Sequence, residues 1–183
     1  MYKICKSEQS AMRQRELENG LLDVMLNHNY EDISVSDLCD HLQIPRKSFY
    51  RYFANKDGAF YALLDHTLEA CNHSIDPHAS VEIAIAQYFS FWFSRSDLLT
   101  ALDRSCLSGK LVERTFEFAM REQGFVERLL RRFPGSEKTT IVMFLSTGLM
   151  AIVLNWHQSG YTQSIDHIAK TITRLLSEPI FPM

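Results

Sequence analysis

The amino-acid sequence predicts an all-α protein with about nine helices, in which a small three-helix domain precedes a larger helical domain. Two observations support this fold class. Apolar residues recur at intervals of three and four along most of the chain, and no segment shows the strict alternation that is typical of a half-buried strand. Proline, glycine and small polar residues interrupt the periodic segments, which divides the chain into helices of ordinary length.

Composition describes a globular chain of 183 residues that is 46% hydrophobic, which is enough to bury a core. The 22 acidic and 19 basic side chains give a net charge of -3, so any binding to nucleic acid must depend on a local cluster of cations. The four cysteines are widely spaced, which is typical of reduced thiols. The N-terminus lacks the apolar run of a signal peptide, and no window approaches the ~20 apolar residues of a membrane span. We therefore expect a cytoplasmic protein without a membrane partner.

The first helix is predicted over residues 7–28, because Leu17, Leu21 and Val24 are spaced for one face. Gly20 interrupts its interior. A glycine there costs about 1 kcal/mol relative to alanine, unless another group packs close against it.

The second helix is predicted to begin after Ser34, which is a favourable N-cap residue. Asp37 lies three residues later, where the acid of a capping box belongs. Leu38 and Leu42 share one face, which we expect to be buried.

The third helix is predicted to begin near Pro45. At 100° per residue, Phe49 and Phe53 lie on one face, while Lys47 and Arg51 point about 160° away from them. One face of this helix therefore packs and the opposite face is cationic.

Residues 45–56 contain four basic side chains and no carboxylate. Ser48, Tyr50 and Tyr52 add hydroxyl groups beside the cations, at the height where a phosphate backbone would run. Two short helices, a tight turn and a basic second helix are the pattern of a helix-turn-helix unit that binds double-stranded DNA.

The fourth helix is predicted over residues 57–71, with Asn55 as its cap and Lys56 at its first position. A cation is unfavourable at that end of a helix dipole, unless an anion such as a phosphate binds there. We divide the chain into a DNA-binding domain, 1–56, and a regulatory and dimerisation domain, 57–183, with the fourth helix as their connector.

Further helices are predicted over 80–94, 96–108, 110–133, 136–159 and 164–179. The last two carry a narrow apolar stripe with a spacing of three and four, which favours a four-helix bundle with a second copy of the chain. The residues assigned to this homodimer interface are Leu145, Leu149, Ile152, Trp156, Ile168, Ile172 and Leu175.

Residues 30–64 resemble the DNA-binding domain of the TetR family of transcriptional regulators. The resemblance is carried by Ile-Ser-Val and Asp-Leu-Cys, followed by Ser-Phe-Tyr-Arg-Tyr-Phe and Lys-Asp. Residues 144–161, FLSTGLMAIVLNWHQSGY, are similar to the end of a regulatory domain common in this family among Firmicutes.

This resemblance implies a homodimer that places its two third helices in successive major grooves of a near-palindromic operator. It assigns base contacts to Ser36, Arg46 and Lys47, and phosphate contacts to Ser48, Tyr50, Tyr52 and Lys56. Arg51 is added from its place on the cationic face.

Two residues depart from the family pattern. Gln43 replaces the usual glycine of the turn, and a non-glycine residue in a left-handed conformation costs roughly 1 to 2 kcal/mol. Pro45 replaces the usual Ser or Thr, so the third helix loses a side-chain cap worth about 1 kcal/mol. We expect the turn to be reshaped between these positions.

The resemblance further implies a small effector that releases the protein, acting as a repressor, from DNA. The aromatic helix over 80–94 and nearby apolar residues suit an apolar or aromatic ligand, although simple core packing explains each residue equally well. The residues assigned to this pocket are Phe89, Trp92, Phe116, Met120, Met143 and Phe144. Two alternatives are an activator or co-regulator that works through a protein partner, and a helical interaction module without DNA binding.

Catalytic motifs are absent from the sequence: it has no G-x-S-x-G, no H-E-x-x-H and no glycine-rich phosphate loop. We therefore expect no enzymatic activity and no cofactor. Cys71, His73, Asp76 and His78 are ligand types that zinc prefers, but their spacing matches no common site. We interpret them as part of a polar linker and expect no metal.

Overall fold

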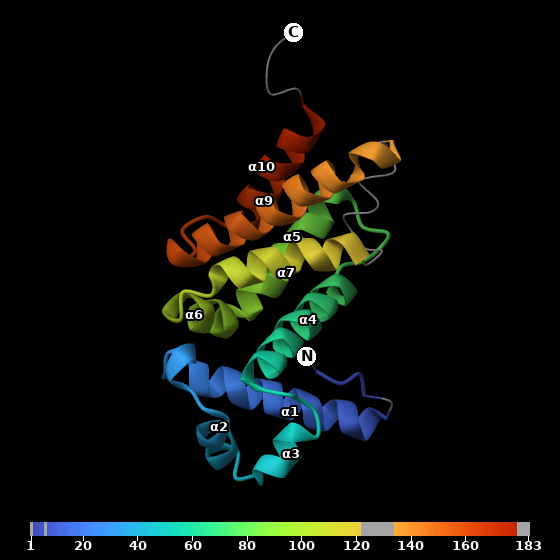
Figure 1. Ribbon diagram of the computed structural model, residues 1–183. Coiled ribbons are helices and arrows are strands. Elements are labelled where there is room, and N and C mark those ends of the chain that lie inside the picture. Colours follow the sequence, from blue (N-terminus) through green and yellow to red (C-terminus); the bar gives the residue numbers. More distant parts are fainter. Residues whose placement is uncertain (1, 6, 122–133, 179–183) are drawn as a thin grey trace. The chain divides into compact units, whose positions relative to one another are not determined.

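A computed structural model describes residues 2–5, 7–121 and 134–178 of the chain (Figure 1). Over these residues it contains nine α-helices, two short 3-10 helices and no strand, which confirms the predicted all-α class. The elements are α1 (Glu8–Met25), η1 (Tyr30–Asp32), α2 (Val35–His41), α3 (Arg46–Tyr50), α4 (Lys56–Ser74), α5 (Val81–Ser94), α6 (Ser96–Arg104), α7 (Ser108–Arg121), η2 (Gly135–Glu137), α9 (Lys138–Gln158) and α10 (Ile165–Ser177). The second half of the helix predicted over 110–133, and the predicted helix end at Pro179, lie outside the described residues.

The chain forms two compact units. Unit 1 comprises Met1–Thr67 and Asp97–Gly109, and unit 2 comprises Leu68–Ser96 and Lys110–Met183. Helix α4 is continuous across the change from one unit to the other. The functional division after residue 56 remains a prediction.

Close packing in unit 1 explains why a glycine occupies position 20 in the interior of α1. A Cβ atom built on Gly20 would lie 2.5 to 2.8 Å from carbon atoms of the Leu42 side chain. Leu42 is the C-cap residue of α2, and α1 packs against α2. Only glycine lets this side chain come so close to the α1 backbone, so the residue that weakens α1 locally also allows α2 to dock on it.

The capping box predicted for α2 is confirmed. The Asp37 amide donates to Ser34 Oγ at 3.1 Å, and the Ser34 amide donates to Asp37 Oδ2 at 2.8 Å. In the turn that follows, Gln43 has a φ of 52°, so it occupies the left-handed conformation expected for this position. Pro45 is the N-cap residue of α3 and makes no side-chain cap hydrogen bond, so α3 begins at Arg46.

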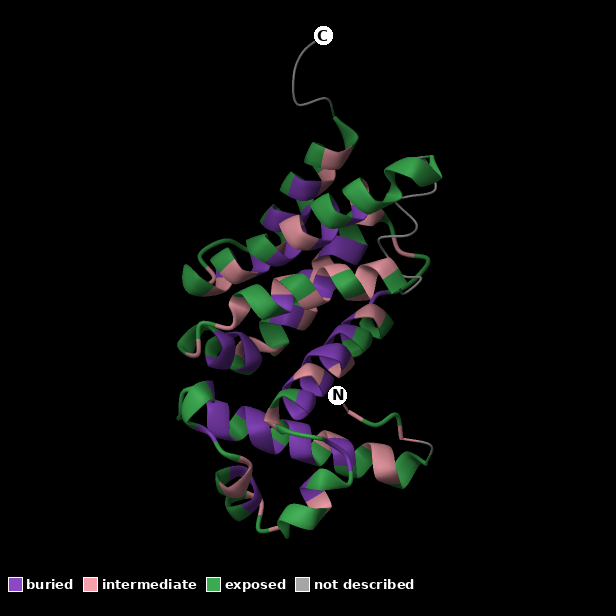
Figure 2. Ribbon diagram, in the orientation of Figure 1, coloured by how far each residue is buried: buried purple, intermediate pink, exposed green. Residues whose placement is uncertain are grey.

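Unit 2 is built on α5, whose residues Ala84, Ile85, Phe89 and Trp92 are all buried. Figure 2 colours the ribbon by burial and shows buried segments along α5. Helices α9 and α10 both pack against α5. Ser80 caps α5 and Ser164 caps α10, and each accepts a hydrogen bond from the amide three residues later.

Several predicted helix boundaries are wrong, among them the end of the fourth helix, predicted at 71 and found at Ser74. Helix α1 ends at Met25, and α6 ends at Arg104 because Cys106 takes a left-handed conformation, with a φ of 55°. Ser136 does not cap α9: it lies inside η2, and α9 begins at Lys138 without a side-chain cap.

One helical stretch, Gly135–Gln158, is long and apolar enough to cross a membrane when judged by length and composition. The prediction that no segment reaches this threshold is therefore wrong. Core helices of soluble proteins can have the same length and composition, and 39% of the most apolar window of this stretch is buried within the protein.

Candidate nucleic-acid interface

Helix α3 is held in unit 1 by two aromatic side chains. Phe49 and Phe53 are almost completely buried, and their ring centroids lie 5.3 Å apart. Helix α2 packs against α3 and contributes the buried Leu38. Because this face of α3 is committed to the core, its other face is turned to solvent, as the helical spacing predicted.

The exposed face of α3 carries cations. Arg46, Lys47 and Arg51 are all exposed. The Arg46 guanidinium is near the ring of Tyr50, one turn later, and its Nη2 donates to the Tyr50 hydroxyl at 3.4 Å. The hydrogen bond to Tyr50 is the main cause of a raised pKa for Arg46, which remains a cation under all ordinary conditions.

The hydroxyl-bearing residues around these cations differ in exposure. Tyr50 is exposed, and Ser36 on α2 and Ser48 on α3 are half-buried. Tyr52 is buried, so most of its surface packs inside unit 1 and is not available to a partner. All eight residues assigned to DNA by the sequence belong to unit 1, and six of them lie within residues 46–52.

Lys56 makes contacts that the sequence did not predict. Its ammonium donates to the backbone carbonyl of Tyr30 and lies 4.1 Å from the centroid of the Tyr30 ring. The Tyr30 hydroxyl donates to Asp57 at 2.7 Å, and burial followed by this contact raises the pKa of Tyr30. Lys56 therefore joins the start of α4 to η1, and its contacts with Tyr30 help to stabilise a cation at this end of α4. Asn55 caps α4 as predicted, accepting from the Gly58 amide at 2.9 Å.

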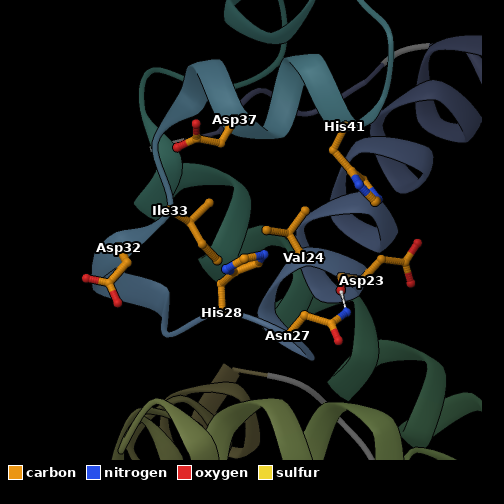
Figure 3. A pocket seen from close by; sticks show the side chains of 8 residues that line it. All are labelled: Asp23, Val24, Asn27, His28, Asp32, Ile33, Asp37 and His41. Carbon is orange, nitrogen blue, oxygen red and sulfur yellow. Dashed lines mark hydrogen bonds between the residues drawn. The ribbon is translucent and has the colours of Figure 1, made fainter.

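A surface hollow of about 410 Å³ lies elsewhere in unit 1 (Figure 3). It is lined by Asp23, Val24, Asn27, His28, Asp32, Ile33, Asp37 and His41. Three carboxylates line this hollow, and the pKa of Asp37 is lowered by its hydrogen bonds to Ser34. A phosphate would be repelled here, so the hollow does not belong to a DNA-binding surface.

A buried polar cluster joins α1 to α4. Glu18 is 1% exposed, and both of its carboxylate oxygens lie within 2.9 Å of His66 Nδ1. Arg15 Nη1 lies 3.4 Å from the same carboxylate. Burial raises the pKa of Glu18 to about 8, against the opposing effect of Arg15. No motif in the sequence indicated this contact, because Glu18 and His66 are 48 residues apart in the chain.

The residues predicted to line a ligand pocket differ in burial. Phe89 and Trp92 are completely buried in unit 2, and Phe116 and Met120 on α7 are half-buried. Met143 and Phe144 are exposed on α9, with Phe144 66% exposed. Met143 and Phe144 do not belong to the α9 stripe that packs inward, and the ligand pocket remains a prediction.

Tyr88 was not predicted, yet it belongs to the same buried region. Tyr88 Oη and Trp92 Nε1 are buried and lack a hydrogen bond of normal geometry within the described part of the chain. The Trp92 indole opposes the effect of burial on Cys71, whose pKa is nevertheless raised. The sequence offered one signal for this pair, which is that Tyr88 and Trp92 lie about one turn apart in an aromatic helix.

Most residues predicted at the dimer interface pack inside the protomer. Leu145, Leu149, Trp156, Ile168 and Ile172 are buried, and Trp156 Nε1 donates to the Gln163 carbonyl at 2.8 Å. The physical reason is that α9 and α10 use their apolar stripe to pack against α5 of the same chain. Ile152 and Leu175 are exposed.

The polar linker residues do not gather around one point. Cys71 is buried, whereas His73, Asp76 and His78 are exposed. Asp76 Oδ1 accepts from the His78 amide at 2.8 Å, as in a turn. Among the residues that the structure describes, no group of three or more suitable side chains is arranged to hold a metal ion.

At the level of sequence, no protein-family model and no curated protein matches this chain. Several solved structures match its fold over most of its length. The dihydroxyacetone kinase operon activator DhaS superposes with a TM-score of 0.64 at 15% identity, covering 91% of this chain and 95% of that one. The TetR family repressor AlkX from a Dietzia species gives 0.56 at 19% identity, covering 90% and 92%. A TetR-family regulator from Streptomyces coelicolor gives 0.60 at 14% identity, covering 91% and 79%. The chain therefore has a TetR-like fold.

Proposed function

We propose that this protein is a dimeric, DNA-binding transcriptional regulator of the TetR type, acting as a repressor in the cytoplasm. The observation that carries the proposal is the build of α3, where Phe49 and Phe53 anchor one face and Arg46, Lys47 and Arg51 stand exposed on the other. The fold shared with solved regulators supports it. We assign the protein no catalytic role.

In this proposal phosphate contacts supply most of the affinity, and a few base contacts supply the discrimination. Ser36, Arg46 and Lys47 read base edges. Ser48, Tyr50 and Arg51 contact the phosphate backbone. Tyr52 and Lys56 are kept in the set with smaller roles, because Tyr52 is buried and Lys56 is already bonded to Tyr30.

The proposal is tested with Lys47→Ala. Lys47 is exposed, so its loss leaves the fold intact and removes one cation from the reading face. We expect a loss of about 1 to 3 kcal/mol in operator affinity if Lys47 contacts a base edge. The affinity is measured by fluorescence anisotropy with a labelled duplex at a stated salt concentration.

Lys170→Ala is the matched control, since Lys170 is an exposed lysine on α10 in unit 2. It should bind the operator as the wild type does. Equal affinities for the wild type and the Lys47 variant would remove Lys47 from the reading face.

The dimer is proposed to form through the exposed apolar side chains of α9 and α10. Met143, Phe144 and Ile152 on α9 and Leu175 on α10 are large apolar residues open to solvent. Apart from the nearby backbone of α9 itself, no atom of the described residues lies within 4 Å of a Cβ built on Gly148, so a partner backbone can approach α9 closely there. A second copy of the chain is the proposed occupant, because two-fold pairing covers this face on both copies at once.

The effector is proposed to be a small apolar or aromatic molecule bound in unit 2. Phe89, Trp92, Phe116 and Met120 supply the apolar surroundings, and Tyr88 Oη and Trp92 Nε1 supply two buried donors. Such a ligand would bear at least one hydrogen-bond acceptor. Binding would act on DNA through α4, which is one continuous helix from Lys56 to Ser74.

An activator is the second candidate, because DhaS, a structure with a similar fold, is described as an operon activator. In this case unit 2 would bind a partner protein and no metabolite would change DNA affinity. A stable partner that co-purifies with the chain, is then identified, and binds unit 2 would favour this function.

A further inference from the structure

Residues Tyr2–Cys5, called here the N-terminal strap, are tied to the chain directly after α3. Tyr2 and Phe53 form an isolated antiparallel β-bridge, and the Lys3 amide donates to the Tyr52 carbonyl at 3.0 Å. Tyr52 and Phe53 are both buried. The strap is therefore fixed by backbone hydrogen bonding to the end of the proposed reading helix.

The same strap is tied to α4. The Tyr2 hydroxyl donates to Asp65 Oδ2 at 2.6 Å, and the Tyr2 ring meets the His66 imidazole edge to face, with centroids 5.6 Å apart. Asp65 is only 7% exposed. A short hydrogen bond to a nearly buried carboxylate is a strong and directional contact.

A third contact ties the strap to α1, where Cys5 Sγ donates to Gln14 Oε1 at 2.8 Å. Apolar burial does not explain the position of the strap, because Ile4 is 90% exposed. Its polar contacts hold it in place, and they reach α1, α4 and the end of α3 at once.

We propose that the strap couples the position of α3 to that of α4, so that the two helices move together. Tyr2 is the positioning residue that sets the angle of the reading helix. The inference rests on the proposed function, in which α4 carries the signal from unit 2. A displacement of α4 moves Asp65, Asp65 carries Tyr2 with it, and the backbone pairing passes the movement to Tyr52 and Phe53. No new contact to DNA is required.

Tyr2→Phe tests the inference, because it keeps the ring and the backbone pairing and removes only the hydroxyl. We expect operator affinity to fall by about three- to tenfold, a size typical for one coupling contact, while affinity for a duplex without the operator stays unchanged. Asp65→Asn keeps an acceptor for the Tyr2 hydroxyl and should retain most of the operator affinity. Ile4→Ala is the matched control within the strap and should bind as the wild type does.

Hydrogen exchange without DNA separates this inference from the proposed function. Tyr2→Phe should speed the exchange of the backbone amides in residues 46–53, and Ile4→Ala should not, with thermal midpoints showing that both variants are folded. Unchanged exchange in folded Tyr2→Phe protein would overturn the positioning role, whether or not the wild type binds an operator. A wild type without any sequence preference would refute the proposed function and, with it, the link from the strap to DNA.

Discussion

At the scale of single residues, Glu18 makes stability depend on pH. Its pKa is raised from 4.5 to about 8 by burial, so between these values the folded chain binds more protons than the unfolded chain. The free energy of unfolding therefore falls as pH rises through this window. Glu18→Gln removes the titrating group and keeps an oxygen that can accept from His66.

We expect the wild type to lose about 2 to 4 kcal/mol more stability than Glu18→Gln between pH 5 and pH 9. Urea denaturation at several pH values measures this difference. Comparing the two slopes cancels the titration of shared groups that do not contact Glu18. Parallel slopes would mean that Glu18 titrates at its ordinary pKa.

Gly20 makes the second residue-scale prediction. Gly20→Ala places a methyl group within 2.8 Å of side-chain carbons of Leu42, so the Leu42 side chain or α2 must move. Overpacking of this kind costs about 1 to 3 kcal/mol, which exceeds the gain in helix propensity. Gly109→Ala on α7 is the control, since no described atom outside the local helix backbone lies within 4 Å of a Cβ built there, and it should be neutral or stabilising. A folded Gly20→Ala protein with an unchanged thermal midpoint would show that Leu42 adapts without cost.

At the scale of helices, α9 has two apolar faces, one buried within the protomer and one exposed. Its buried stripe packs against α5, and its exposed apolar residues are proposed to meet a second copy. Phe144→Glu should therefore yield a folded monomer, because Phe144 is 66% exposed and its replacement disturbs no core contact. Light scattering with circular dichroism measures both properties.

Ile83→Glu on α5 is the control, because Ile83 is also an exposed apolar residue and lies outside the proposed dimer face. It should remain dimeric. Ile172→Glu, by contrast, should unfold unit 2, since Ile172 is 6% exposed. A folded Phe144→Glu protein that still forms dimers would place the interface elsewhere.

At the scale of the whole molecule, local signals in the sequence predicted local structure well. Ser34, Asp37 and Gln43 each act through neighbours within four residues, so their roles could be inferred before the fold was known. The cationic face of α3 could be inferred in the same way, from a helical wheel.

Partners distant in the chain could not be inferred. An apolar stripe shows that a helix is covered but not by what, which is why Leu145 and Ile168 were assigned to a second copy although they pack inside the protomer. The bond from Tyr2 to Asp65 and the placement of residues 97–109 in unit 1 depend on tertiary structure, which leaves no periodic signal in the sequence.

The central claim is that this chain reads DNA sequence as a dimer, and a binding selection from a pool of random duplexes tests it most directly. We predict enrichment of a near-palindromic sequence whose half-sites are separated by about one helical turn of DNA or a multiple of it. The combined Arg46→Ala and Lys47→Ala variant should lose that enrichment while it stays folded. Recovery of duplexes with no shared sequence by the folded wild-type protein would contradict the account.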